Sequence, residues 1–178
     1  MSKNKKIILS ALLLAMSIVL SRFLSIKTPI LTISFSFVPT MLCAIWLGPK
    51  WTILISILSD LIGATLFPFG SFFIGYTITT AVAAAIYGFL LYKKEEDTYS
   101  DKQFVLRTIL AVVLVTVIAN IGLNTLWLTI TTGKAFMVLL ASRMVKELIM
   151  VPIKVIMMLF LERVLRKPFN TYLRGEND

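Results

Sequence analysis

The chain has 178 residues, of which 58% are hydrophobic, and its mean hydropathy is +0.89. A soluble core of this size cannot bury so much apolar surface, so the composition indicates an integral membrane protein. The sequence has no histidine and one cysteine, Cys43, which argues against an internal disulfide, a histidine-based catalytic site, a metal and a cofactor. Basic residues flank the apolar segments, so we interpret the net charge of +9 as membrane topology rather than nucleic-acid binding.

Six apolar segments follow one another along the chain. A helix needs about 20 residues, within a range of about 17–25, to cross the hydrocarbon core of a membrane. We therefore predict an all-α integral membrane protein with six transmembrane helices in a single domain over residues 1–178. The segments are roughly Ile7–Ile26, Leu31–Leu47, Trp51–Leu66, Phe72–Tyr92, Phe104–Thr132 and Phe136–Leu165.

The connections between the segments support this count. The first segment follows the basic sequence MSKNKK, but no A-x-A-like cleavage site ends it, so we expect a retained helix rather than a signal peptide. Gly48-Pro49-Lys50 predicts a tight hairpin between the second and third helices, and Lys93–Gln103 predicts a solvated loop. No internal repeat is visible, which argues against an inverted-repeat secondary transporter.

The basic residues predict the orientation. Six helices place both termini on one side of the membrane, and that side carries twelve of the eighteen lysines and arginines. The opposite loops carry only Lys27 and Lys134, so we expect both termini in the cytoplasm. The sequence lacks G-x-x-x-x-G-K-[ST], so any ATP-driven uptake needs an ATPase on another subunit.

The last apolar segment carries charges that are costly in lipid. Four of its residues share one helix face at the spacing i, i+4, i+7 and i+11, and charges grouped in this way should face the protein interior or an aqueous cavity. They are Arg143, Glu147, Met150 and Lys154, with Lys146 about 60° to the side.

The fifth segment has the same spacing in a set of polar and aromatic residues. These are Asn120, Asn124, Trp127 and Thr131. The fifth helix should run outward and the sixth inward, so the two polar faces should meet in the outer half of the membrane. Two facing polar surfaces at that depth indicate a binding site.

These residues also have a purely structural interpretation. Arg143 and Glu147 could form an i,i+4 ion pair, and asparagines inside membranes often hold helices together. Trp127 could belong to the interfacial aromatic belt, and Arg22 could extend to the outer surface. Lys154 lies nearest the midplane, so we expect it to need an internal acceptor such as a backbone carbonyl freed by a proline.

The charges inside the apolar segments do not balance. Four cations and two acids leave a surplus of two positive charges, which an anionic ligand would compensate. Aromatic residues nearby could stack on a flat ring of such a ligand. The charged residues are Arg22, Asp60, Arg143, Lys146, Glu147 and Lys154, and the aromatic residues are Trp127, Phe67, Phe69 and Phe72.

Two further stretches carry a family resemblance. The sequence ALLLA places two small residues, Ala11 and Ala15, one turn apart, and Ser59–Thr77 reads SDLIGATLFPFGSFFIGYT. Together they resemble the substrate-binding S components of energy-coupling factor (ECF) vitamin transporters, although Ile74 stands where many relatives have proline. The resemblance covers nearly the whole chain, and residues 143–165 are most similar to the folate-specific members.

The resemblance implies a function and partners. Such a protein lies in the plasma membrane of a bacterium, binds a vitamin from outside with high affinity, and docks on a shared T component that carries two ATPases. It is thought to tip over in the membrane to release its load. Ala11 and Ala15 would contact the T component. Other residues match a pattern that is shared among S components with different substrates, so they would serve the fold or gating rather than specificity. They are Asp60, Gly63, Pro68, Gly70, Gly75 and Thr77.

Folate fits the predicted site, because its two carboxylates match the surplus charge and its pterin ring presents donors that a carboxylate or an amide could accept. The predicted ligand-binding residues are Arg22, Asp60, Phe69, Asn120, Asn124, Trp127, Arg143, Lys146 and Glu147. Other functions stay open from the residues alone: the same fold for riboflavin or pantothenate, a membrane-embedded enzyme, or a structural bundle. No nucleophile–base pair with recognisable spacing occurs, so we expect no enzymatic activity.

Overall fold

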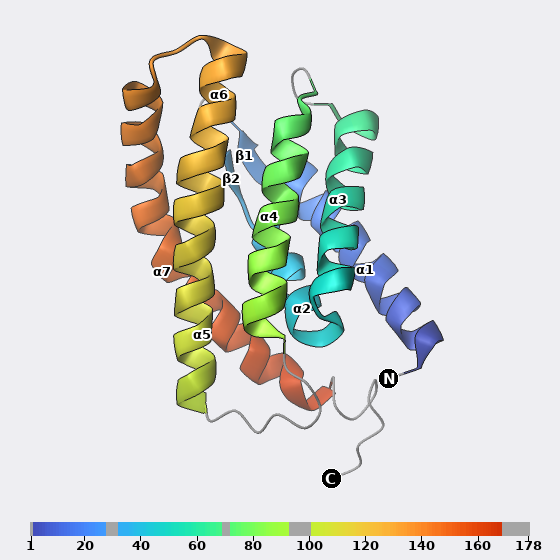
Figure 1. Cartoon of the computed structure of the whole chain (residues 1–178). Helices are drawn as coiled ribbons and strands as arrows, with labels where there is room; N and C mark the ends of the chain where they lie inside the picture. Colours follow the sequence, from blue (N-terminus) through green and yellow to red (C-terminus); the bar gives the residue numbers. More distant parts are fainter. Residues whose placement is uncertain (1, 28–31, 69–71, 93–100, 169–178) are drawn as a thin grey trace.

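The computed structural model describes residues 2–27, 32–68, 72–92 and 101–168. Its helices stand side by side in one bundle, and α1 begins near the end of the bundle at which α7 ends (Figure 1). The helices are α1 (Lys3–Arg22), α2 (Phe37–Leu47), α3 (Pro49–Leu66), α4 (Ile74–Leu91), α5 (Asp101–Leu114), the π-helix η1 (Val115–Leu123), α6 (Asn124–Thr132) and α7 (Phe136–Pro168). The two strands are β1 (Ser25–Lys27) and β2 (Thr32–Ser34).

The described part of the chain forms six helical rods, because α5, η1 and α6 follow one another without a break. This confirms the predicted all-helical architecture. Four rods are long and apolar enough to cross a membrane, namely α1, α3, α4 and the rod that contains Lys102–Thr132. α2 has 11 residues and is too short to cross a hydrocarbon core that needs about 20. α7 has 33 residues and is long enough, but its charged side chains exclude it from this apolar group. The cytoplasmic location of the termini stays a prediction.

A short β-hairpin precedes α2. β1 and β2 pair antiparallel, with Ser25 opposite Ser34. The prediction that a helix runs from Leu31 is therefore wrong for the described residues before Phe37. Polar and apolar side chains alternate through residues 32–36, and this period of two favours a strand over a helix.

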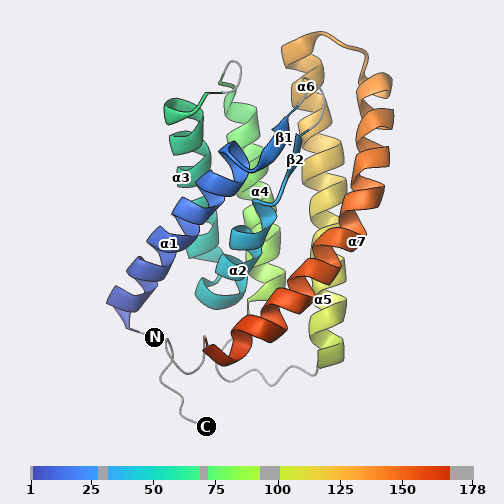
Figure 2. The ribbon, with the colours of Figure 1, turned by 180° about the vertical axis from the view of Figure 1, so that it is seen from behind.

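α2 forms the centre of the molecule. It is apolar on every side, as expected for a helix that is buried all round, and both Met41 and Ala44 are fully buried. α1, α3, α4 and α7 pack against it (Figures 1 and 2). The predicted hairpin between α2 and α3 is present: Gly48 has a φ of 82°, which favours glycine, and Pro49 is the first residue of α3.

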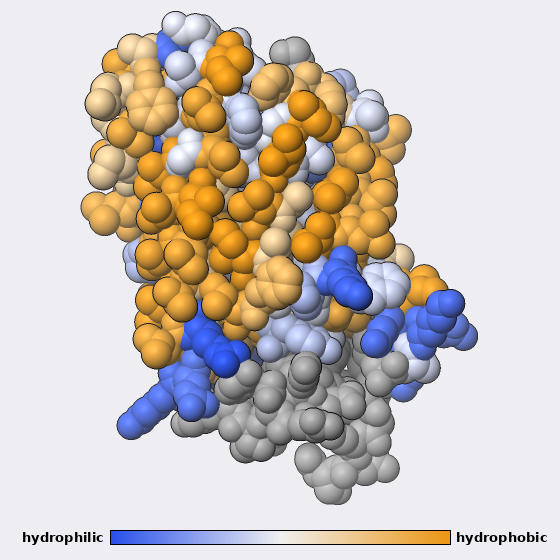
Figure 3. Space-filling view, viewed as in Figure 1, coloured by the Kyte–Doolittle hydropathy of each residue, from blue (hydrophilic) through white to orange (hydrophobic). Residues whose placement is uncertain are grey.

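The face of the bundle seen in Figure 3 is apolar over most of its height, and hydrophilic side chains gather near one end. The exposed apolar side chains come from every long helix and include Leu12, Leu54, Phe89, Leu106 and Leu148. A surface of this kind is suited to lipid rather than to water.

Candidate functional site

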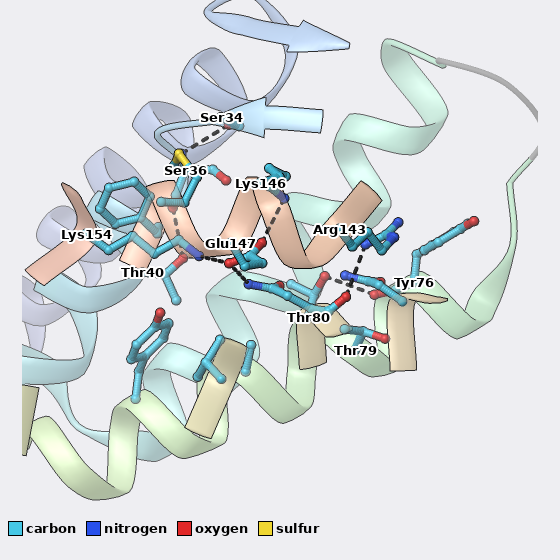
Figure 4. Close-up of a pocket in the computed structure, with 17 residues that line it drawn as sticks. Ser34, Ser36, Thr40, Tyr76, Thr79, Thr80, Arg143, Lys146, Glu147 and Lys154 are labelled. Atoms are coloured by element: carbon cyan, nitrogen blue, oxygen red, sulfur yellow. Dashed lines mark hydrogen bonds and ion pairs between the residues drawn. The ribbon is translucent and has the colours of Figure 1, made fainter. Parts of the chain in front are cut away.

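A cavity of about 370 Å³ lies between α7, α4, the η1–α6 rod and the connection from β2 into α2. Its volume is within the range of about 300–1,000 Å³ that is typical of ligand pockets. The side chains that line it are mainly polar or charged, and they converge from all four elements (Figure 4).

The two polar faces predicted from the sequence meet in this cavity. The four residues of the predicted α7 face line it together with Lys146, and so do Asn120 and Asn124, but not Trp127 or Thr131, from the opposite rod. The α7 residues and the two asparagines thus lie together at the cavity, whereas ligand binding by these residues stays a prediction.

Glu147 is the centre of the charge network on α7, and its side chain is only 2% exposed. Its Oε1 atom lies 2.8 Å from Nζ of Lys146, and its Oε2 atom accepts from Nζ of Lys154 at 2.8 Å. Oε2 also accepts from Nδ2 of Asn120 at 3.1 Å and from the hydroxyl of Thr116 at 3.4 Å. One carboxylate thus serves two ammonium groups and ties α7 to η1.

These contacts correct two expectations. The acceptor of Lys154 is a carboxylate rather than a backbone carbonyl freed by a proline. Arg143 does not pair with Glu147: its Nη1 donates to the carbonyl oxygen of Asn120 at 3.1 Å, and no carboxylate of the described residues lies within salt-bridge distance of it. The Nε atom of Arg143 is buried without a hydrogen-bond partner among the described residues. The guanidinium therefore lines the cavity as a cation that the described chain does not neutralise.

The π-helix η1 explains how Asn120 makes two of these contacts. It spans nine residues and contains Asn120, whose side-chain amide donates to Glu147 while its backbone carbonyl accepts from Arg143. A π-helix pairs residues five apart, so the rotation of 100° per residue assumed from the sequence does not apply here. Such segments are rare and are frequent at functional sites.

Trp127 does not line the cavity, contrary to the expectation that it shares a face with the asparagines. Its Nε1 donates to the hydroxyl of Thr79 at 2.9 Å, and its ring packs against Phe73 with centroids 5.7 Å apart. Thr79 lines the cavity, so Trp127 supports the cavity wall from behind.

Arg22 and Asp60 form a separate cluster. Nη2 of Arg22 lies 4.0 Å from Oδ1 of Asp60, and Nη1 donates to the carbonyl of Phe67 at 3.3 Å. The hydroxyl of Thr77 donates to Oδ2 of Asp60 at 2.7 Å. The structure therefore does not bring these two predicted residues to the cavity, and they lie beside each other instead. The predicted residue Phe69 lies outside the described residues.

Because Arg22 and Asp60 lie apart from the cavity, the surplus positive charge predicted from the sequence lies at the cavity itself. Arg22 and Asp60 offset each other, so the cavity keeps Arg143, Lys146 and Lys154 against Glu147, which is a surplus of two positive charges. In the described part of the chain, no three histidine, cysteine, aspartate or glutamate side chains gather as a metal site would require.

α4 contributes residues that the sequence analysis missed. Tyr76, Thr80, Ala83 and Tyr87 line the cavity, and they have the same spacing of i, i+4, i+7 and i+11 as the residues of α7. Their spacing was the available signal, but hydroxyl groups are much less costly in a membrane than charges and so attract less attention. β2 and α2 add Ser34, Ser36 and Thr40.

Ala11 and Ala15 lie on the outer surface of α1, where both are exposed, while Leu9, Leu13 and Ser17 of the same helix are buried. The two alanines thus leave a shallow strip on which a partner helix could approach closely. Their role in partner binding stays a prediction.

An apolar helical bundle with a charged internal cavity defines a class of membrane protein that holds a polar or ionic small molecule within its helices. Within that class the chain belongs to the family of ECF transporter substrate-specific components, whose family model matches residues 5–162. This confirms the family predicted from the sequence.

Named relatives refine the comparison. The chain is 42% identical over 156 residues to the folate transporter FolT of Clostridium novyi (strain NT), a match that covers 88% of this chain and 87% of that protein. It is 40% identical over 157 residues to the folate transporter FolT of Leuconostoc mesenteroides subsp. mesenteroides, covering 85% of this chain and 81% of that protein. The crystal structure of FolT bound with folic acid superposes with a TM-score of 0.79 at 38% identity, covering 88% of this chain and 92% of that one.

The network around Glu147 makes a testable prediction about stability. Lys154→Met should lower the free energy of unfolding by about 1–3 kcal/mol, because a buried carboxylate oxygen loses its cation while Lys146 still offsets part of the charge. Glu147→Gln/Lys154→Met should recover part of this loss, because the charge and its partner leave together. Thermal unfolding in detergent measures the two single variants, Lys154→Met and Glu147→Gln, and the double variant, with the exposed Lys134→Met as the control that should not shift. A double mutant that loses the sum of the two single losses would contradict the network.

Proposed function

We propose that this chain is the folate-binding subunit of an ECF-type importer in a bacterial plasma membrane. It captures the vitamin from outside and delivers it through a T component with two ATPases. The observation that carries the proposal is the surplus of two positive charges in the cavity, in a chain whose relatives are named folate transporters. Folate carries two carboxylates, so its charge complements that of the cavity.

The cavity can recognise both ends of such a ligand. Arg143 offers guanidinium donors that no carboxylate of the described residues occupies, and guanidinium groups bind carboxylates with two parallel hydrogen bonds. The amide of Asn124 lines the cavity and presents both donors and an acceptor, which suits the edge of a pterin. The rings of Tyr76 and Tyr87 line the α4 wall and offer flat surfaces for stacking.

Energy for uptake comes from other subunits in this proposal. The sequence has no P-loop, so hydrolysis of ATP needs separate ATPases. The strip of small residues on α1 gives the T component a place to dock, because its exposed alanines permit close approach of a second helix.

Arg143→Ala tests the ligand. The substitution removes a charge-assisted contact worth about 1.5–3 kcal/mol, so the dissociation constant for folic acid should rise about 10- to 100-fold. Titration calorimetry on the purified chain measures this, and Lys134→Ala removes a cation outside the cavity as the matched control. An Arg143→Ala protein that binds folic acid as tightly as the parent would exclude Arg143 from recognition.

Ala11→Trp and Ala15→Trp test the partner face. Each puts a large side chain on the exposed strip of α1, so uptake of folate by cells that express the whole transporter should be lost. Binding of folic acid to the isolated chain should stay within about twofold of the parent. Leu148→Trp places the same side chain at a position on α7 that is 79% exposed and serves as the control for bulk on the lipid-facing surface. Equal loss of binding and uptake would show that the strip belongs to the fold or the pocket.

A further inference from the structure

The carboxylate of Glu147 is already occupied by protein groups. Oε2 receives three donors, from Lys154, Asn120 and Thr116. Oε1 is buried and lies 2.8 Å from the ammonium of Lys146, a charge contact without hydrogen-bond geometry, so Oε1 has no hydrogen-bond partner among the described residues. A carboxylate oxygen has about two lone-pair sites, so Oε2 with its three donors has no site left for a ligand, and Oε1 is buried beside the ammonium of Lys146.

The two lysines, by contrast, have donors to spare. An ammonium group carries three donors, and both Lys146 and Lys154 contact Glu147, with no second hydrogen-bond partner for either among the described residues. Both lysines line the cavity, and both ammonium groups lie beside Glu147 in Figure 4. Their remaining donors are therefore available to a ligand.

We propose that Glu147 is a positioning residue that holds Lys146 and Lys154 in place as receptors for the carboxylates of the ligand, and that it does not bind the ligand itself. This rests on the proposed function, because it takes folate as the ligand. It gives Glu147 a different role from the direct contact predicted from the sequence.

The physical reason lies in the lysines themselves. A lysine side chain is a flexible stem with a point charge, and two ammonium groups close together repel each other. Lys146 precedes Glu147 by one residue and Lys154 follows it by seven, so a single carboxylate between them holds both charges on the cavity side of α7. Fixed donors bind an anion more tightly than mobile ones, because less conformational entropy is lost on binding.

Folic acid and its bisamide, in which both carboxylates of the glutamate are neutral amides, distinguish the two roles. In the parent protein the bisamide should bind at least about tenfold more weakly than folic acid, as expected when a charge-assisted contact is lost. Glu147→Gln should weaken folic acid about tenfold or more and leave the bisamide within about threefold, so that the ratio of the two dissociation constants collapses. Glu162→Gln makes the same change on α7 outside the cavity and should leave the ratio unchanged.

Each other outcome has a defined meaning. Equal weakening of folic acid and bisamide by Glu147→Gln would overturn the positioning role, because it would place Glu147 against the ring, and an unchanged affinity for both would overturn it as well. If Glu147→Gln does not fold, the same ratio is measured in Glu147→Asp, which keeps the negative charge and both lysines but draws the carboxylate back from their ammonium groups, so the ratio should fall here too. A parent protein that binds neither compound would defeat the proposed function itself.

Discussion

The arrangement of the cavity depends on one carboxylate, that of Glu147, which lies between the ammonium groups of Lys146 and Lys154. An isolated lysine at the depth of Lys154 is expensive in a membrane, and α7 carries a second lysine and an arginine within three turns of it. Glu147 offsets this cost by pairing with both lysines, and its hydrogen bonds with Asn120 and Thr116 connect the group to η1. The same arrangement leaves the cavity positive, because one acid cannot neutralise three cations.

The surrounding fold maintains a polar space inside an apolar bundle. α2 fills the centre of the molecule with buried apolar side chains, while Ser34, Ser36 and Thr40 bring hydroxyl groups to the cavity wall. In the π-helix, both the side-chain amide and the backbone carbonyl of Asn120 make hydrogen bonds to α7. Polar groups from four elements thus satisfy one another or face the cavity, and the lipid-facing side of the bundle stays apolar.

The sequence predicted the rods and the α7 face because both depend on regular periodicity. Charges at i, i+4 and i+11 must share a helix face, whatever the helix packs against. It did not predict which charged side chains pair with each other, because spacing gives the side of a helix on which a residue lies and not the residue that it contacts. Lys154 pairs with Glu147, and Arg22 lies beside Asp60 outside the cavity. The β-hairpin was not predicted, because the length of an apolar segment does not separate a strand from a helix. The π-helix η1 was not predicted, because a fixed rotation of 100° per residue describes only the α-helix.

The most direct test of the account is calorimetric titration of the purified chain, without T component or ATPases, with folic acid. The account predicts saturable binding of one folic acid per chain, and no saturable heat with riboflavin or pantothenate, which lack a pair of carboxylates to offset the surplus charge of the cavity. Binding of riboflavin or pantothenate in place of folic acid, or no binding of any of the three, would contradict it.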